Sequence, residues 1–170
     1  MMILLAIAAY IVLFSIQTSL LSAFSVSGVT LDLALIIAVY FGVLSRGDRG
    51  IWAGFFIGLF QDFLSGSLLG INTLSKSLIG FTFSTIKDKL MVVGFVPISL
   101  ILFASSIFDG LIYYVVATAL LQAQIPFSFL FNTLPIYAMY NALVGPILFF
   151  FINWSRKRLS KKFPALEASS

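Results

Sequence analysis

The sequence predicts an all-helical membrane protein that crosses the bilayer six times, and three observations lead to this fold class. The 170-residue chain is 61% hydrophobic and only 9% charged, whereas a soluble domain is about a quarter charged. Long apolar runs separate the charged residues, and almost all of the basic residues fall on one side of an alternating path. A surface with so few charges must be solvated mainly by lipid.

Polar breaks define the first three expected spans. An uncharged stretch at 2–24 is long enough to cross a hydrocarbon core of about 30 Å. It lacks a basic start and is longer than the apolar part of a signal peptide, so we expect an uncleaved helix. A Ser/Gly break at 25–28 precedes a second expected span at 29–44, and the turn at 45–50 precedes a third at 51–64.

Three further spans are expected in the second part of the chain. The fourth lies at 68–86, between a Ser/Gly turn and a basic loop. Pro97 fits a first helical turn, which places the fifth span at 98–121. Pro135 offers a similar starting point for the sixth span, which we expect at 136–154.

The positions of Lys and Arg predict that both chain termini lie in the cytoplasm, where these residues accumulate in short loops. Nine of the ten basic residues fall at 45–50, at 87–89 and in the tail, and the three opposite loops hold none. Five or seven spans would scatter the positive charge over both sides. We therefore expect one six-helix transmembrane domain at 1–154 and a basic cytoplasmic tail at 155–170 that faces anionic lipid.

The composition excludes most catalytic chemistry. The chain contains no His and no Cys, which removes thiol nucleophiles, Ser-His pairs and the usual zinc ligands. Its single glutamate, Glu167, lies in the tail. We expect no enzymatic activity, no metal, no cofactor and no nucleic-acid partner.

Four ionisable residues fall inside or at the ends of the expected spans, where each needs a structural or functional reason: Asp32, Asp62, Lys76 and Asp109. Asp62 and Lys76 each lie eleven residues from the cytoplasmic end of their span, about 16 Å at helical rise. Equal depth on neighbouring helices predicts an ion pair between them, and a structural bridge is favoured over a proton- or ligand-coupled pair. Asp109 is a possible second partner of Lys76, and Asp32 is expected near the outer end of its span, within reach of water.

Small residues recur every fourth position along the third expected span. The stripe consists of Gly50, Gly54, Gly58, Asp62 and Gly66. Such spacing is typical of a close-packing helix face. Packing within the chain is the favoured interpretation, and a partner-binding face that includes Gly54 and Gly58 is the alternative.

Several of these segments resemble the rod-shape-determining MreD family. They are Leu31-Asp32-Leu33, the turn Ser45-Arg46-Gly47-Asp48-Arg49-Gly50, the run from Gly54 to Gly66, and Leu69-Gly70-Ile71-Asn72-Thr73-Leu74. The resemblance extends over the whole chain and its topology, and its specific residues lie mainly between Leu31 and Phe81.

The resemblance implies a non-enzymatic subunit of the cell-elongation machinery in the bacterial inner membrane. Such a subunit would bind the single-span protein MreC and help position peptidoglycan synthesis to maintain cell shape. MreB, RodA and its transpeptidase would be further companions. These implications concern function and partners, and none of them follows from the residue pattern alone.

The family also resembles the six-helix substrate-binding components of energy-coupling-factor vitamin transporters, which supplies an alternative function. A solute-binding subunit would hold its ligand near Asp62, Asn72, Lys76 and Asp109. These subunits are expected to carry an Ala-x-x-x-Ala pattern in their first helix, and here Ala6 and Ala8 are not followed by such partners. An enzyme that uses Asp62 and Asp109 as an acid pair is a third interpretation, for which the predicted helices give no sign of convergence.

Overall fold

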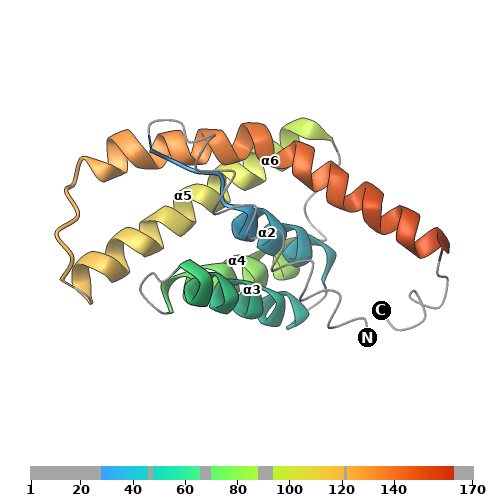
Figure 1. Ribbon diagram of the computed structural model, residues 1–170, viewed down its shortest axis with the longest axis horizontal. Coiled ribbons are helices and arrows are strands. Elements are labelled where there is room, and N and C mark those ends of the chain that lie inside the picture. Colours follow the sequence, from blue (N-terminus) through green and yellow to red (C-terminus); the bar gives the residue numbers. More distant parts are fainter. Residues whose placement is uncertain (1–27, 46–47, 66–69, 88–93, 121, 163–170) are drawn as a thin grey trace.

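The structure, a computed structural model, describes residues 28–45, 48–65, 70–87, 94–120 and 122–162. This part of the chain is helical, as predicted, and contains five helices (Figure 1): α2 (Leu33–Leu44), α3 (Arg49–Ser65), α4 (Ile71–Ile86), α5 (Phe95–Ala119) and α6 (Phe129–Lys162). The first expected span, at 2–24, lies outside the described residues.

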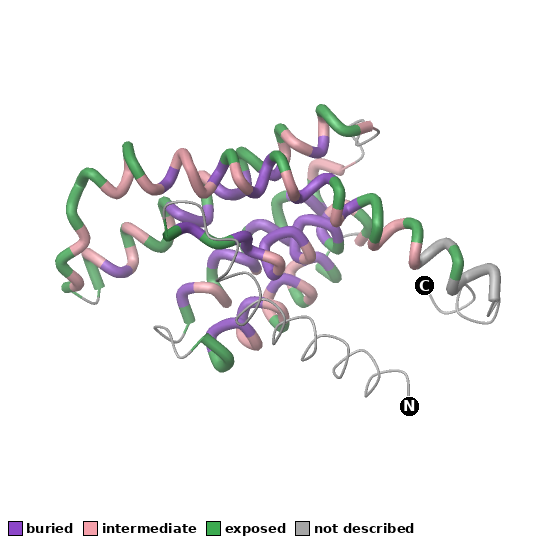
Figure 2. The backbone as a smooth tube through the Cα atoms, turned by 45° about the horizontal axis from the view of Figure 1, so that its top comes forward, coloured by how far each residue is buried: buried purple, intermediate pink, exposed green. Residues whose placement is uncertain are grey.

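Helix α2 lies at the centre of the described helices and contacts the four others. It is apolar on all sides, which is typical of a helix that is buried all round, and Leu35, Val39 and Tyr40 are almost fully buried. These side chains pack in one core with Ile79 of α4 and Leu102 of α5. Figure 2 shows the buried segments gathered where the helices converge and the exposed segments on their outer sides.

Helices α3 and α4 form a closely packed antiparallel pair. Their contact uses three glycines of the small-residue stripe: Gly50, Gly54 and Gly58. A Cβ atom at these positions would collide with the backbone carbonyls of Gly80, Lys76 and Asn72, respectively. The stripe is therefore occupied by packing within the chain, because it lets two backbones approach more closely than any larger residue would allow.

Helices α5 and α6 are the longest, and they also run antiparallel. Gly110 of α5 lies against Leu134 of α6, and Leu102 lies against Gly145. By length and composition, α5 and the part Phe129–Ser155 of α6 could each cross a membrane. Helix α2 is apolar but shorter.

Several helix boundaries differ from the sequence prediction, most of all the starts of α2 and α6. Helix α2 begins at Leu33 rather than Val29, because Asp32 is its N-cap and accepts a hydrogen bond from the amide of Leu35 at 2.9 Å. Helix α6 begins at Phe129 rather than Ile136, so Pro135 lies inside the helix and not at its start.

Helix α6 also continues beyond 154, through a second proline, Pro146, to Lys162. The ribbon of α6 changes direction between its orange and red parts (Figure 1), and proline inside a helix is a common cause of such bends. Helix α5 begins at Phe95, which places Pro97 in the first turn as predicted.

Candidate functional site

Lys76 lies at the centre of the most polar part of the interior. Its side chain is fully buried, with an exposed fraction of 0%. The ammonium donates hydrogen bonds to Oδ1 of Asp109 at 2.8 Å and to Oδ1 of Asn72 at 3.0 Å, and it forms an ion pair with Oδ2 of Asp32 at 3.0 Å. Its three N–H groups therefore have three acceptors.

The two carboxylates reach Lys76 from different helices. Asp32 is placed by its role as the N-cap of α2, and its backbone amide donates to Oδ1 of Asn141 on α6 at 3.0 Å. The Oδ1 atom of Asp32 also accepts a hydrogen bond from Nε2 of Gln61 on α3 at 3.3 Å. Asp109 lies in the middle of α5 and accepts a short hydrogen bond from the hydroxyl of Ser75.

Tyr137 of α6 completes this arrangement. Its hydroxyl oxygen lies 3.0 Å from Oδ2 of Asp32 and 3.0 Å from Oδ2 of Asp109. We refer to Asp32, Lys76, Asp109 and Tyr137 as the charge cluster. It joins α2, α4, α5 and α6 at one point in the low-dielectric interior, where unpaired charges would be costly.

Asp62 does not belong to the charge cluster. Its carboxylate accepts hydrogen bonds from the backbone amides of Gly70, Asn72 and Thr73 at 2.9, 3.2 and 2.9 Å, and from the side chains of Asn72 and Thr73 at 2.9 and 2.6 Å. These groups form the N-terminus of α4. Asp62 of α3 thus caps a neighbouring helix whose own N-cap, Gly70, has no side chain to do so.

The expected ion pair between Asp62 and Lys76 is therefore wrong, and Lys76 pairs with Asp109 and Asp32. The expected equal depth of the two residues is wrong, because the contacts between α3 and α4 place Lys76 against Gly54 and Asn72 against Gly58. Asp62 follows Gly58 by one turn and so lies beside the start of α4. The backbone amides at the start of α4 are the hydrogen-bond donors that Asp62 meets there. Asn72 connects the two sites, since its amide donates to Asp62 and its carbonyl accepts from Lys76.

The expectation for Asp32 is corrected as well. Asp32 stands at the start of α2, as predicted, but it is only 7% exposed and is held by protein groups rather than water. The role of Asp109 as a partner of Lys76 is confirmed.

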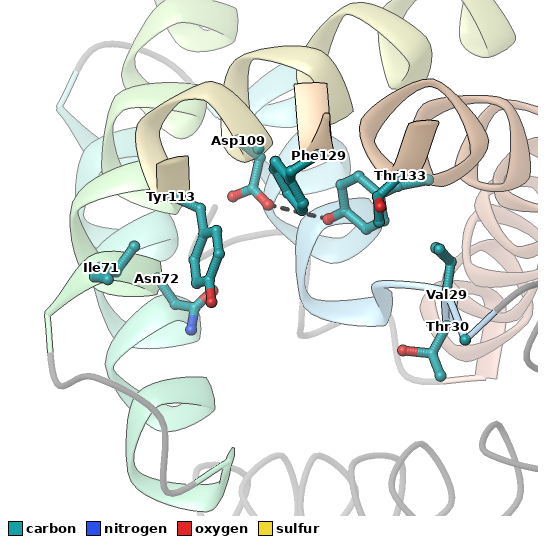
Figure 3. Close-up of a pocket in the computed structure, with 11 residues that line it drawn as sticks. Val29, Thr30, Ile71, Asn72, Asp109, Tyr113, Phe129 and Thr133 are labelled. Atoms are coloured by element: carbon teal, nitrogen blue, oxygen red, sulfur yellow. Dashed lines mark hydrogen bonds between the residues drawn. The ribbon is translucent and has the colours of Figure 1, made fainter. Parts of the chain in front are cut away.

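A partly open cavity of about 220 Å³ lies beside the charge cluster (Figure 3). Asp109 and Tyr113 of α5, Asn72 of α4, and Phe129 and Tyr137 of α6 contribute to its lining. Small-molecule pockets usually measure about 300–1,000 Å³, so this cavity is small for a vitamin-sized solute. Asn72 and Asp109 line it as the solute-binding alternative expected, whereas Asp62 and Lys76 are not among its lining residues.

Sequence reasoning missed the uncharged members of this site. They are Gln61, Ser75, Tyr137 and Asn141. A signal was present for two of them, because Tyr137 and Asn141 are four residues apart and therefore share one face of an apolar helix. The side chains of this site pair charges and hold the helices together. The acid pair of the third interpretation, Asp62 with Asp109, is not formed, because the two carboxylates bind different groups.

These helices and this buried ion network define an all-helical membrane protein whose polar residues serve to join helices. Comparison with protein families gives a match to the rod shape-determining protein MreD over residues 1–157. The chain belongs to the MreD family, as its resemblance indicated. Searches of curated proteins and of solved structures gave no match.

Family membership gives the protein a role in rod-shape determination and places it among shape-determining membrane proteins. This is a structural family, which acts within the MreBCD shape complex and so favours a partner of the MreC type in general. The vitamin-transporter alternative has no support from the comparisons.

Proposed function

We propose that the protein is a non-enzymatic scaffold of the cell-elongation complex in the bacterial inner membrane. It binds the single transmembrane helix of an MreC-type partner and helps position peptidoglycan synthesis. MreB, RodA and a transpeptidase are its further companions in this proposal. Support comes from the family match over residues 1–157. Further support comes from the exposed large apolar side chains of the outer helices.

The observation that carries the proposal is the contrast between the two kinds of helix face. The glycines of α3 are occupied by α4, so they are not available to a second protein. Large apolar side chains, in contrast, remain exposed on the outer helices. On α6, Met139, Leu143 and Ile147 are 57, 60 and 62% exposed and lie four residues apart, so they form one continuous face for lipid or for a partner helix.

The proposal includes six spans with both termini in the cytoplasm. The antiparallel contact of α3 and α4 brings Arg49 and Lys87 to the same end of the pair, which supports assigning both to the cytoplasmic side. At the far end of α6, the guanidinium of Arg158 lies 3.9 Å from the ring centre of Trp154. An aromatic ring followed by basic residues is typical of a membrane interface that meets anionic headgroups.

The test is affinity capture of the protein from gently solubilised membranes, combined with photo-crosslinking residues placed at exposed positions. Trp52, Phe103 and Leu143 sample the exposed faces of α3, α5 and α6. Leu102, which is fully buried, is the matched control for Phe103. We expect an MreC-type protein to be recovered and to crosslink to one exposed face and not to Leu102.

Recovery of an ATPase pair with a coupling membrane subunit, or of a stoichiometric vitamin, would contradict the scaffold and favour a transport role. Recovery of the elongation proteins without a crosslink at any of the three helix faces would support membership in the complex. It would contradict contact through a helix face and indicate contact through the loops.

A further inference from the structure

The charge cluster carries more negative than positive charge. Among the residues that the structure describes, the titratable groups that form it are Asp32 of α2, Lys76 of α4, Asp109 of α5 and Tyr137 of α6. Helix α3 contributes the uncharged side chain of Gln61. Two carboxylates and one ammonium leave one negative charge in excess. An excess charge in a low-dielectric interior is strongly unfavourable.

The hydrogen-bond distances give the same result by a separate count. Lys76 has three N–H hydrogens for its three acceptors, and the Ser75 hydroxyl has one hydrogen for Asp109. The Tyr137 hydroxyl also has one hydrogen, yet its oxygen lies at 3.0 Å from two carboxylate oxygens. With both acids ionised, a single hydrogen would have to be shared between these two contacts in a bifurcated bond, whereas a proton on one carboxyl gives each contact a hydrogen of its own.

We propose that the cluster is a proton-binding site, which holds one additional proton on the carboxyl pair Asp32/Asp109 where both acids meet Tyr137. One carboxylate takes up a proton and becomes a carboxylic acid, whose O–H donates to the Tyr137 oxygen. The Tyr137 O–H then donates to the other, ionised carboxylate. The cluster becomes neutral and every close contact acquires a hydrogen, as in other pairs of acids that share one site.

The neighbouring cavity gives this proton a way to exchange. Asp109 and Tyr137 both line it, so the proton is held at the boundary between the packed interior and an opening of about 220 Å³. Tyr113, the other titratable group of that lining, is partly exposed. The proposal concerns the state of the folded chain alone, and it does not depend on which partner the protein binds.

Infrared spectroscopy of the purified full-length protein tests the proposal, because a protonated carboxylic acid has a C=O stretching band that an ionised carboxylate lacks. We expect this band in the wild type at neutral pH, with a small shift on transfer to D₂O. Both Asp109→Asn and Asp32→Asn should abolish it, since either substitution removes the excess negative charge and Asn supplies the missing donor. Asp48→Asn, at an exposed site outside the cluster, should leave the band unchanged.

A folded wild-type protein without the band at neutral pH would overturn the proposal, as would a band that persists in both cluster variants. If an Asn variant does not fold, the wild type still decides the question through a pH series. The band should disappear as the pH rises, and the midpoint of thermal unfolding should fall over the same pH interval, because the charge returns to the interior. A band and a midpoint that are both constant up to high pH would also overturn it.

Discussion

Lys76 neutralises carboxylates from two helices, so its loss should affect the protein more than the loss of a surface ion pair. In Lys76→Met, Asp32 and Asp109 keep their places without a cation. We predict that the free energy of unfolding falls by about 3–5 kcal/mol, the range for breaking a buried pair from one side. Unfolding of the purified protein in mixed detergent, followed by circular dichroism, measures this change.

Second-site changes distinguish the observed pairing from the one that depth along the helices suggests. Adding Asp32→Asn and Asp109→Asn to Lys76→Met should restore much of the stability, because no unpaired charge remains in the interior. Adding Asp62→Asn to Lys76→Met should restore none. If the double variant Lys76→Met/Asp62→Asn regained the lost stability, Asp62 would be the true partner of Lys76.

The capping role of Asp62 leads to a separate prediction. Asp62→Ala removes the acceptor for three amides at the start of α4 and should lower the free energy of unfolding by about 2–3 kcal/mol. Asp62→Asn keeps one carbonyl acceptor and should cost less. Hydrogen exchange at the amides of Gly70 and Thr73 locates the effect, and unchanged exchange in Asp62→Ala would rule out the cap.

For single residues, the sequence pointed to the important charged side chains but not to all of their contacts. Asp109 was expected as a partner of Lys76, since both are costly to leave alone in lipid. The capping role of Asp62 was not foreseen, because it depends on how a turn between two helices directs its amides. Tyr137 is missed for a different reason: a Tyr in an apolar run is usually a packing residue.

The contact between α3 and α4 makes its glycines sensitive to a single added carbon. Gly54→Ala and Gly58→Ala place a Cβ against the carbonyls of Lys76 and Asn72, and backbone cannot move aside as a flexible side chain can. We predict a loss of at least about 1–3 kcal/mol for each, seen as a lower midpoint of thermal unfolding in detergent.

Ala119→Leu serves as the control for the glycine variants, because it adds more atoms at an exposed position near the end of α5. Its unfolding midpoint should equal that of the wild type. Gly54 and Gly58 variants that also unfold like the wild type would show that α3 and α4 are further apart than in this structure.

Helix positions were easier to predict than helix ends. Charged turns and apolar runs located α2 to α6 approximately, because few side chains can lie within a bilayer. The start of α6 was placed seven residues too late, at Ile136 rather than Phe129. Proline lacks one amide donor, and its position as the first residue of a helix was a reasonable expectation, but the backbone of an α-helix in lipid tolerates an internal proline when neighbouring groups satisfy the freed carbonyl.

For the molecule as a whole, the proposed topology can be tested with single cysteines, because the natural chain has none. Asp48 precedes α3 and Ser128 precedes α6, and both are exposed. With both termini in the cytoplasm, a membrane-impermeant maleimide added to cells with a permeabilised outer membrane should label Ser128→Cys and not Asp48→Cys. Lysed cells, in which both should react, provide the control.

Labelling of Asp48→Cys in unlysed cells, without labelling of Ser128→Cys, would mean that the protein has the opposite orientation in the membrane. Labelling of both would contradict the six-span count, because these two positions could then not be on opposite sides. The distribution of basic residues, which predicted the topology, would in either case need an explanation other than retention of positive charge in the cytoplasm.

The cap that Asp62 places on α4 has a consequence for biosynthesis. Helix α3 on its own would bring a carboxylate into the bilayer without a donor, at a cost that disfavours its entry. Helix α4 on its own would bring in amides at its first turn that no side chain of its own caps. Each helix supplies what the other lacks, so α3 and α4 should leave the translocon together, as a preassembled hairpin, rather than one after the other.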